Sequence, residues 1–212
     1  MRALIIGVTG ATGKDLVAVM LEDPSYTQVV AFVRRSSGLA HSKYSEVITD
    51  FGKLEGVSDF IKGDVWFSCL GTTLKTAGTR EKQWQIDYDI PAKFAEIAKR
   101  NAVPRAVVVS AYGASPNSKV FYSRMKGELD EHIASLGFDQ CLIFKPGFLL
   151  RKDTDRVSEL VMAHALKFVN ALGLFRNFRP LPTSTLAAKL AKAPMAFGPG
   201  KHVIELEKVF TV

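Results

Sequence analysis

Residues 4–13, which read Leu-Ile-Ile-Gly-Val-Thr-Gly-Ala-Thr-Gly, constrain the fold of this chain more than any other stretch. An apolar run ends in three glycines, Gly7, Gly10 and Gly13, and a helix-compatible segment, Lys14–Leu21, follows at once. The first glycine permits a turn that would strain other residues, and the second lets a ligand approach the backbone. The third lets the helix pack closely on the strand. This order predicts a strand, a tight turn and a helix N-terminus.

The same turn is suited to an anion. Free backbone N–H groups at a helix N-terminus, together with the helix dipole, favour negative charge. The G-x-x-G-x-x-G spacing could serve only a tight turn, but its place directly after Ala3–Ile6 favours a phosphate cradle. We therefore expect the diphosphate of a dinucleotide here. The residues expected to hold it are Gly7, Thr9, Gly10, Ala11, Thr12 and Gly13.

Length and composition fit a single globular domain. The chain has 212 residues, of which 47% are hydrophobic and 23% charged. A chain of this length should bury about 70% of the surface that its unfolded form exposes. Cys69 and Cys141 lie inside apolar runs, which predicts buried thiols in a reducing compartment rather than a disulfide. No His/Cys cluster has metal-ligand spacing, so no metal is expected.

Charge and hydropathy bear on location and partners. No stretch of about 18 apolar residues is present, and the apolar N-terminal run is too short for a signal peptide. These features predict a cytoplasmic protein without an integral membrane segment. The net charge of +7 is scattered, apart from the adjacent Arg34 and Arg35. Because no reading motif accompanies it, this charge indicates anionic small molecules rather than nucleic acid as partners.

The pattern of elements predicts the fold class. Short β-branched runs alternate with longer helical segments, which is typical of an α/β, doubly wound parallel sheet. Pro91 predicts a kink or break in its helix. The expected strands are Ala3–Val8, Gln28–Val33, Glu46–Thr49, Val65–Cys69, Ala106–Ser110 and Gln140–Phe144. The expected helices are Lys14–Leu21, Lys82–Arg100, Phe121–Leu136 and Arg156–Leu172.

From Pro146 onward the alternation weakens. A Pro-rich turn at residues 179–182 precedes a short expected helix, Ser184–Lys192, and a last strand near His202–Leu206. We expect a single domain over residues 1–212, in which residues 147–212 partly form a small lobe on the substrate side. Ligands of open α/β sheets bind outside the carboxyl ends of the strands, so the chemistry is expected there.

The residues after the second expected strand bear on the cofactor. Proteins that use NAD place an acidic residue near this point, whereas an arginine accommodates the 2′-phosphate of NADP. Arg34 and Arg35 stand here with no Asp or Glu beside them. They favour NADP over NAD, and two solvated surface arginines are the alternative.

Two further strand ends are candidates for cofactor contacts. Asp50, after the third strand, could accept a hydrogen bond from the adenine amine or simply start a turn. After the fourth strand, Leu70, Gly71 and Thr72 are expected to let the backbone approach the middle of the cofactor. A plain turn is the alternative at that point.

A third strand end carries groups suited to proton transfer. Ser110 ends the fifth expected strand, and Tyr122 and Lys126 lie four residues apart on one face of the next helix. A phenol titrates near pH 10, and an ammonium one turn away should lower that pKa. Ser110 could then hold a substrate oxygen while Tyr122 moves a proton and hydride passes to or from a nicotinamide. A Tyr-x-x-x-Lys pair is common by chance, but the glycine turn favours this interpretation.

These motifs resemble the short-chain dehydrogenase/reductase superfamily in its atypical or extended branch and, more narrowly, the small proteins related to the Tat-interacting oxidoreductase. The resemblance implies a Rossmann fold, bound NADP(H) and catalytic Ser110, Tyr122 and Lys126. It also implies that Lys126 holds the nicotinamide ribose and that the turn at Pro146 and Gly147 lies beside the nicotinamide ring. The matching parts are Gly7-x-x-Gly10-x-x-Gly13, Arg34-Arg35, residues 68–73, Ser110, Tyr122-x-x-x-Lys126 to Glu128, and residues 145–151.

One feature departs from the family pattern. Standard members carry an asparagine, on the helix after the fourth strand, that supports a proton-relay water. The nearest residues here are Asp87, Tyr88 and Asp89. The departure puts the relay in doubt but not hydride transfer itself.

We expect an NADP(H)-dependent oxidoreductase that acts on a small carbonyl or alcohol, and the alternative is an NADP(H)-binding redox sensor without turnover. A sugar-nucleotide epimerase would need a larger substrate lobe. Residues 160–178 are basic and rich in aromatic side chains. We interpret them as the core of the substrate lobe, with a homodimer face or a weak membrane contact as alternatives.

Overall fold

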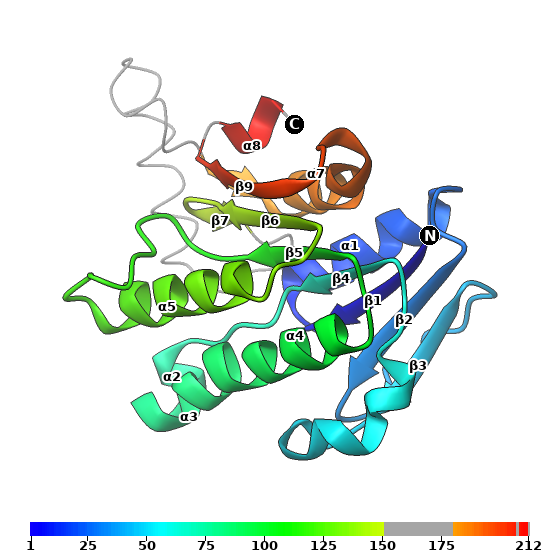
Figure 1. The fold of residues 1–212 in the computed structure, drawn as a ribbon, viewed down its shortest axis with the longest axis horizontal. Helices are drawn as coiled ribbons and strands as arrows, with labels where there is room; N and C mark the ends of the chain where they lie inside the picture. Colours follow the sequence, from blue (N-terminus) through cyan, green and yellow to red (C-terminus); the bar gives the residue numbers. More distant parts are fainter. Residues whose placement is uncertain (151–179, 207, 212) are drawn as a thin grey trace.

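The computed structural model describes residues 1–150, 180–206 and 208–211. Its centre is a sheet of seven parallel strands in the order β3-β2-β1-β4-β5-β6-β9 (Figure 1). The strands are β1 (Arg2–Ile6), β2 (Gln28–Val33), β3 (Tyr44–Ile48), β4 (Val65–Ser68), β5 (Arg105–Val109), β6 (Gln140–Lys145) and β9 (Gly200–Glu205).

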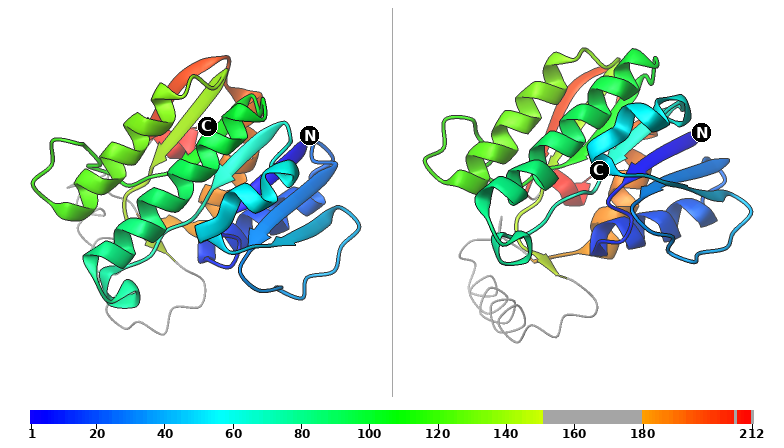
Figure 2. Two further views of the ribbon diagram at one scale, coloured as in Figure 1. Left: turned by 60° about the horizontal axis from the view of Figure 1, so that its bottom comes forward. Right: turned by 90° about the horizontal axis from the view of Figure 1, so that it is seen from below.

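Helices cover both faces of this sheet, which confirms the predicted Rossmann-type, doubly wound architecture. In Figure 2, α4 and α5 lie side by side across one face, and α1 and α7 occupy the other. The helices are α1 (Ala11–Glu22), the 3-10 segment η1 (Phe51–Phe60), α2 (Leu74–Ala77), α3 (Arg80–Trp84), the π-helical η2 (Gln85–Asp89), α4 (Ile90–Arg100), α5 (Phe121–Ser135), α7 (Thr183–Ala196) and α8 (Lys208–Thr211).

The central strands are apolar throughout because their side chains are buried in two hydrophobic cores, one on each face of the sheet. Ile5 and Phe67 point into the core under α1 and α7, whereas Leu4 and Trp66, the preceding residues in β1 and β4, point into the core under α4 and α5. Trp66 stacks on Phe94 of α4 with ring centroids 5.5 Å apart. Each large side chain buried in this way contributes about 2–3 kcal/mol. Burial on both faces therefore explains the continuous apolar runs.

The chain order reverses at β1. This strand pairs with β2 on one side and with β4 on the other, so successive crossovers run in opposite directions from it. The connections that leave the carboxyl ends of β1 and β4 consequently diverge. In an open α/β sheet this topological switch point is the expected place for a ligand.

The predicted helix Lys82–Arg100 is divided in the structure. It consists of α3, one π-helical stretch, η2, and then α4, with Pro91 in the first turn of α4. A proline is tolerated there because the first helical turn leaves N–H groups without partners. The kink or break expected at Pro91 takes the form of this π-helical turn, since the backbone at Trp84, Asp89 and Ile90 stays helical. Asp87, within the π-helical turn, is buried.

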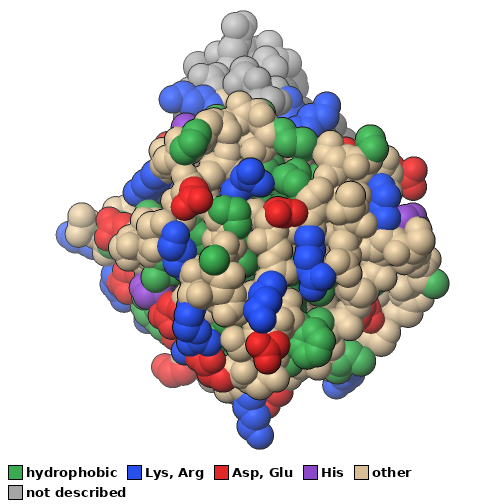
Figure 3. Space-filling model, turned by 45° about the vertical axis from the view of Figure 1, so that its right-hand side comes forward, with side chains coloured by type: hydrophobic (Ala, Val, Ile, Leu, Met, Phe, Trp, Pro, Cys, Tyr) green, Lys and Arg blue, Asp and Glu red, His purple; other side chains and the backbone are tan. Residues whose placement is uncertain are grey.

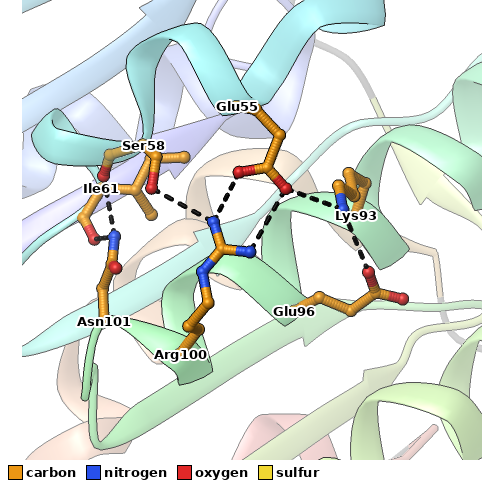
Figure 4. A network of polar contacts seen from close by, with 7 residues as sticks. All are labelled: Glu55, Ser58, Ile61, Lys93, Glu96, Arg100 and Asn101. Atoms are coloured by element: carbon orange, nitrogen blue, oxygen red, sulfur yellow. Dashed lines mark hydrogen bonds and ion pairs between the residues drawn. The ribbon is translucent and has the colours of Figure 1, made fainter.

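A polar network joins η1 to α4 (Figure 4). The Glu55 carboxylate of η1 forms ion pairs with two side chains of α4. Its oxygens lie 2.5 Å from the Arg100 guanidinium and 2.9 Å from Lys93 Nζ. Asn101 donates from its amide nitrogen to the Ile61 carbonyl at 2.9 Å, just beyond η1. The network fixes the segment that begins at Phe51.

The last part of the chain extends the main sheet. β9 pairs in parallel with β6 as the seventh strand, and α7 packs against α1. Thr183 at the start of α7 donates to the Asp15 carboxylate of α1 at 2.6 Å. The predicted helix Ser184–Lys192 and the predicted last strand thus exist, but both belong to the main domain.

A two-stranded parallel pair, β7 (Leu149–Leu150) and β8 (Leu181–Pro182), lies outside the main sheet. The expected helix Arg156–Leu172 and the aromatic stretch at 160–178 fall between these strands, outside the described residues. The division into a domain and a small substrate lobe therefore stays a prediction. None of the helices in the described ranges is long and apolar enough to cross a bilayer.

The surface carries mixed charge. On the face shown in Figure 3, Lys and Arg side chains are interspersed with Asp and Glu, and hydrophobic side chains occupy smaller areas between them. The basic residues of this face are thus spread out rather than gathered in one patch, as their scatter along the sequence suggested.

Candidate functional site

A cavity of about 660 Å³ opens at the switch point between β1 and β4. It brings together eight of the residues predicted to contact a cofactor, from three strand ends that are distant in sequence. These are Gly7, Thr9, Gly10, Arg34, Arg35, Leu70, Gly71 and Thr72. The remaining lining residues are Val8, Phe32, Val33, Phe51, Cys69, Thr76, Ile86 and Ile90.

The glycine turn has the geometry that its spacing predicted. Gly7 has φ +85°, and a Cβ atom there would stand 2.5 Å from the backbone carbon of Cys69. A Cβ atom at Gly13 would stand 2.2 Å from the Gly7 carbonyl oxygen. At Gly10 the nearest atom would be 3.4 Å away. The outer two glycines are therefore required by packing, whereas Gly10 borders the open cavity.

The N-terminus of α1 meets the cavity. The helix begins at Ala11, three residues before the predicted start, and Gly10 caps it without a side-chain hydrogen bond. The first turn, which contains Thr12, carries no acidic side chain. Its N–H groups and the positive end of the helix dipole therefore suit an external anion.

Arg34 and Arg35 follow β2 and are both exposed on the cavity lining. Neither guanidinium forms an ion pair within the described ranges. The Asp50 carboxylate accepts from the Gly52 N–H at 2.9 Å and caps the N-terminus of η1. This observation favours the turn interpretation of Asp50, while its neighbour Phe51 lines the cavity.

The loop after β4 is held by η2 and α3. The Thr72 N–H donates to Asp87 Oδ1 at 2.7 Å, and Gln83 Nε2 donates to the Thr72 carbonyl at 3.2 Å. Asp87 is fully buried, and its Oδ2 has no hydrogen-bond partner within the described structure. Burial raises the pKa of Asp87 to about 6, although Lys126 and the Thr72 N–H act in the opposite direction.

The proposed catalytic groups gather beside the cavity, not on its lining. Ser110 Oγ donates to Asp130 Oδ2 at 2.8 Å, and buried Lys126 donates from Nζ to the Val109 carbonyl at 3.2 Å. Tyr122, in the first turn of α5, keeps 39% of its surface exposed. The Val109 carbonyl lies at the end of β5, which pairs with β4, and β4 ends at Ser68, directly before Cys69 on the cavity lining. Lys126 thus lies close behind the cavity wall.

The expectation that Lys126 lowers the pKa of Tyr122 is wrong for this structure. Burial, and then the negative charges of Asp87 and Asp130, raise the pKa of Tyr122 to about 12. The physical reason is that a phenolate would add a third negative charge to two carboxylates in a partly dry environment. At neutral pH the Tyr122 hydroxyl consequently keeps its proton.

Asp130 and Lys145 belong to this group and were not among the predicted site residues. Lys145 Nζ, at the end of β6, lies 3.5 Å from Asp130 Oδ2 and donates to the Ala114 carbonyl at 2.9 Å. A sequence signal for Asp130 existed, since Tyr122, Lys126 and Asp130 succeed one another at intervals of one helical turn. Lys145 carried no such signal because it comes from another element.

Pro146 and Gly147 do not line the cavity. The Pro146 carbonyl accepts from the Tyr112 N–H at 3.0 Å, and a Cβ atom at Gly147 would meet Leu206 at 3.2 Å. Their suggested position beside the nicotinamide stays a prediction. The apolar lining residues Ile86 and Ile90 were missed because they share the pattern of ordinary core positions.

The fold and its glycine turn define a dinucleotide-binding protein of the Rossmann type. Residues 7–168 match the family described as NAD(P)H-binding. Protein FMP52, mitochondrial, of Eremothecium gossypii is 33% identical over 150 residues, which cover 71% of this chain and 67% of the relative. Protein HTATIP2 of Rattus norvegicus is 34% identical over 150 residues, which cover 69% and 62%. The chain belongs to this NAD(P)H-binding family, in the atypical short-chain dehydrogenase/reductase group that its motifs resemble.

The fold also matches a solved structure that contains a nucleotide. The Bordetella bronchiseptica enzyme WbmH, in complex with NAD+, superposes with a TM-score of 0.70, over 96% of this chain and 75% of that protein. Sequence identity is 14%, so this match shows the fold alone.

The predicted cytoplasmic location is contradicted by the relatives. FMP52 proteins of Eremothecium gossypii, Candida albicans and Saccharomyces cerevisiae are all named mitochondrial. The prediction used unpaired cysteines and the lack of an apolar span, and these properties do not distinguish one reducing compartment from another.

Proposed function

We propose that this protein is an NADP(H)-dependent oxidoreductase that transfers hydride to or from a small carbonyl or alcohol. The observation that carries the proposal is the hydrogen bond of the buried Lys126 ammonium to the Val109 carbonyl at the end of β5, beside the end of β4 that leads into the cavity lining, with Ser110 directly after β5. A cavity at the switch point and proton-transfer groups beside it are what such a reaction requires.

Three parts of the cavity lining support a dinucleotide with an additional phosphate as the ligand. The N-terminus of α1 and the glycine turn suit the diphosphate, because Gly7 and Gly13 leave no space for side chains and Gly10 borders the cavity. Arg34 and Arg35 suit the 2′-phosphate of NADP, since a guanidinium matches phosphate geometry. Leu70, Gly71 and Thr72 would contact the middle of the cofactor.

The chain's own groups would act on the oxygen of the substrate. Bound NADP(H) supplies or accepts the hydride. In reduction, Tyr122, protonated at neutral pH, would donate its proton to the carbonyl oxygen that becomes an alcohol, and the phenolate would regain a proton from water. In oxidation, Tyr122 would first have to release its proton to water before it could accept the proton of the alcohol. Ser110 holds the same oxygen, and Lys126 provides the positive charge that stabilises an anionic oxygen as it forms.

We also propose a mitochondrial location, because the FMP52 relatives carry that name. Import into isolated mitochondria, followed by protease protection, tests it. Complete digestion of the added protein would count against the proposal.

The decisive experiment combines binding with turnover. Nucleotide that co-purifies with the protein is identified by mass, and NADPH consumption is then measured across a panel of small aldehydes, ketones and quinones. The Tyr122→Phe variant should bind NADPH as the wild type does and lose turnover by about 10²–10⁴-fold, the usual effect of lost acid–base help.

A matched variant, Tyr88→Phe, removes a hydroxyl from η2 outside the proton-transfer group and should leave turnover unchanged. Equal turnover in Tyr122→Phe and the wild type would reject the proton-transfer role. Tight NADPH binding without consumption across the whole panel would favour the redox-sensing alternative.

A further inference from the structure

The loop that follows the two arginines is fixed by a carboxylate of the same chain. Glu46, on β3, accepts from Ser36 Oγ at 2.7 Å and from Ser37 Oγ at 2.5 Å. It also accepts from the Ser37 N–H at 3.0 Å and from the Tyr44 hydroxyl at 2.9 Å. One partly exposed carboxylate thus accepts hydrogen bonds from four donors beside the segment that follows β2 and carries Arg34 and Arg35.

These donors are of the kind that phosphate groups require. Two hydroxyls and one backbone N–H, directly after two guanidinium groups, form a donor set with which proteins hold phosphate oxygens. In this structure Glu46 occupies the hydroxyls and the N–H of Ser36 and Ser37. The arginines are the only members of the set without such a contact in the described part of the chain.

Glu46 also keeps its charge over the working pH range. Burial alone would raise its pKa, but the hydrogen bonds from Ser37, Ser36 and Tyr44 bring the pKa of Glu46 down to about 2. A permanent negative charge therefore stands on the Ser36 and Ser37 donors, which a phosphate held by the same donors would have to approach. Like charges at this separation repel, and salt screens the repulsion because the site is partly exposed.

We propose that Glu46 is a specificity-determining residue, which occupies the Ser36 and Ser37 donors and thereby weakens the preference of the site for NADP over NAD. This inference rests on the proposed function, because it requires a nucleotide in the cavity beside Arg34 and Arg35. NAD lacks the 2′-phosphate, so its affinity should depend little on Glu46. The chain would then discriminate between the two cofactors less than its two arginines suggest.

The test measures dissociation constants of NADP+ and NAD+ by calorimetry at low ionic strength. Glu46→Gln keeps an acceptor for the serines but removes the charge, and it should raise the NADP+ to NAD+ affinity ratio by about three- to tenfold. The gain should shrink in 0.5 M salt, at which exposed charges are largely screened. Glu22→Gln, at the far end of α1, makes the same change in net charge and should leave the ratio unchanged.

A second set of variants does not depend on the folding of Glu46→Gln. In the wild-type background Ser36→Ala/Ser37→Ala should alter NADP+ affinity by less than about twofold, because Glu46 already holds both hydroxyls. In the Glu46→Gln background the same pair should remove part of the gain, which a double-mutant cycle detects.

The outcomes separate this inference from the proposed function. If both nucleotides bind and the ratio in Glu46→Gln is unchanged or lower, the role of Glu46 is overturned and the oxidoreductase proposal stands. A marked loss of NADP+ affinity in the wild-type Ser36→Ala/Ser37→Ala variant would also overturn it. If the wild type binds neither nucleotide, the proposed function fails and the inference falls with it.

Discussion

The nucleotide side and the proton-transfer side of this protein are built in different ways. The cavity at the ends of β1, β2 and β4 consists largely of backbone, glycine and two exposed arginines. The group at the ends of β5 and β6 consists of buried ionisable side chains, among them Lys126, Asp130 and, from η2, Asp87. The first region is open to a ligand before it binds, whereas the second holds its charges away from water.

The difference shows which physical effect dominates the properties of each region. Close backbone approach and helix polarity govern the nucleotide side, and they depend on residues that are near in sequence. Desolvation governs the proton-transfer side, and it depends on what several distant elements bring together. Substitutions on the two sides should therefore change different measured properties.

The largest expected effect comes from the glycine turn. Gly13→Ala would put a Cβ atom 2.2 Å from the Gly7 carbonyl oxygen. The oxygen belongs to the backbone and the Cβ atom is fixed to the Cα atom of α1, so neither can move away without a shift of the backbone. We expect a loss of about 3 kcal/mol of unfolding free energy and of NADPH binding, measured by urea unfolding and calorimetry. Gly10→Ala is the matched variant, with its nearest neighbour at 3.4 Å. It should cost less than about 1 kcal/mol yet still weaken binding, and equal destabilisation by both would contradict the assignment.

The second effect concerns the buried carboxylate of Asp87. Its pKa in the folded protein is about 6, above the ordinary 3.8, so the folded state binds a proton more readily than the unfolded chain does. Stability therefore falls as the pH rises from about 4 to about 6, and above that range the buried charge costs up to about 3 kcal/mol. Asp87→Asn should accordingly be more stable than the wild type at pH 7.5, by about 1–3 kcal/mol, but not at pH 4.

Urea unfolding at the two pH values measures this difference. Asp59→Asn, whose carboxyl side chain is almost fully exposed, should show no comparable gain. A variant at Asp87 that is less stable than the wild type at pH 7.5 would show that its charge is compensated in the folded state.

The third effect is confined to the cofactor's extra phosphate. Arg34→Ala and Arg35→Ala should each weaken NADPH binding by about tenfold, as expected for one lost guanidinium–phosphate contact, and leave NADH binding within about twofold. Lys62→Ala, at an exposed position just before β4 and thus at the other end of the sheet, serves as the control. Equal losses for both nucleotides would indicate a general electrostatic effect instead.

The smallest effect has the opposite pH dependence from that of Asp87. Hydrogen bonds from Arg100 and Lys93 lower the pKa of Glu55 to about 2, so its contribution is present above the ordinary 4.5 and is lost as the pH falls toward 2. Glu55→Gln should lower the Tm slightly at pH 7 and less at pH 3 or in 1 M salt, because the pairs are exposed. A Tm difference that grows on acidification would contradict this sign.

Sequence reasoning succeeded where the cause is local. The strand Gln28–Val33 was predicted with its observed bounds, and a helical irregularity stands where Pro91 predicted a kink or break, because both follow from side-chain shape and backbone restriction. Arg34 and Arg35, expected at the end of the second strand, line the cavity, and their contact with a cofactor stays a prediction. Strand ends were misjudged by one or two residues where pairing, not composition, decides them.

Sequence reasoning failed where the structure depends on a contact between residues that are distant in sequence. Nothing in the local pattern indicated that Glu46 would hold Ser36 and Ser37, or that Lys145 would meet Asp130. The raised pKa of Tyr122 was missed for the same reason, since it depends on burial and on Asp87, which comes from another element.

The sequence by itself determined the strand–turn–helix with its glycines, the alternation that makes a parallel sheet, and the helical face shared by Tyr122 and Lys126. Each of these follows from backbone conformation or from residue spacing along a single element. Only the tertiary structure decided which carboxylates surround the phenol, which carboxylate occupies the serines beside the arginines, and how far the last strand extends the sheet. These are set by desolvation and by contacts across the chain, and a linear pattern records neither.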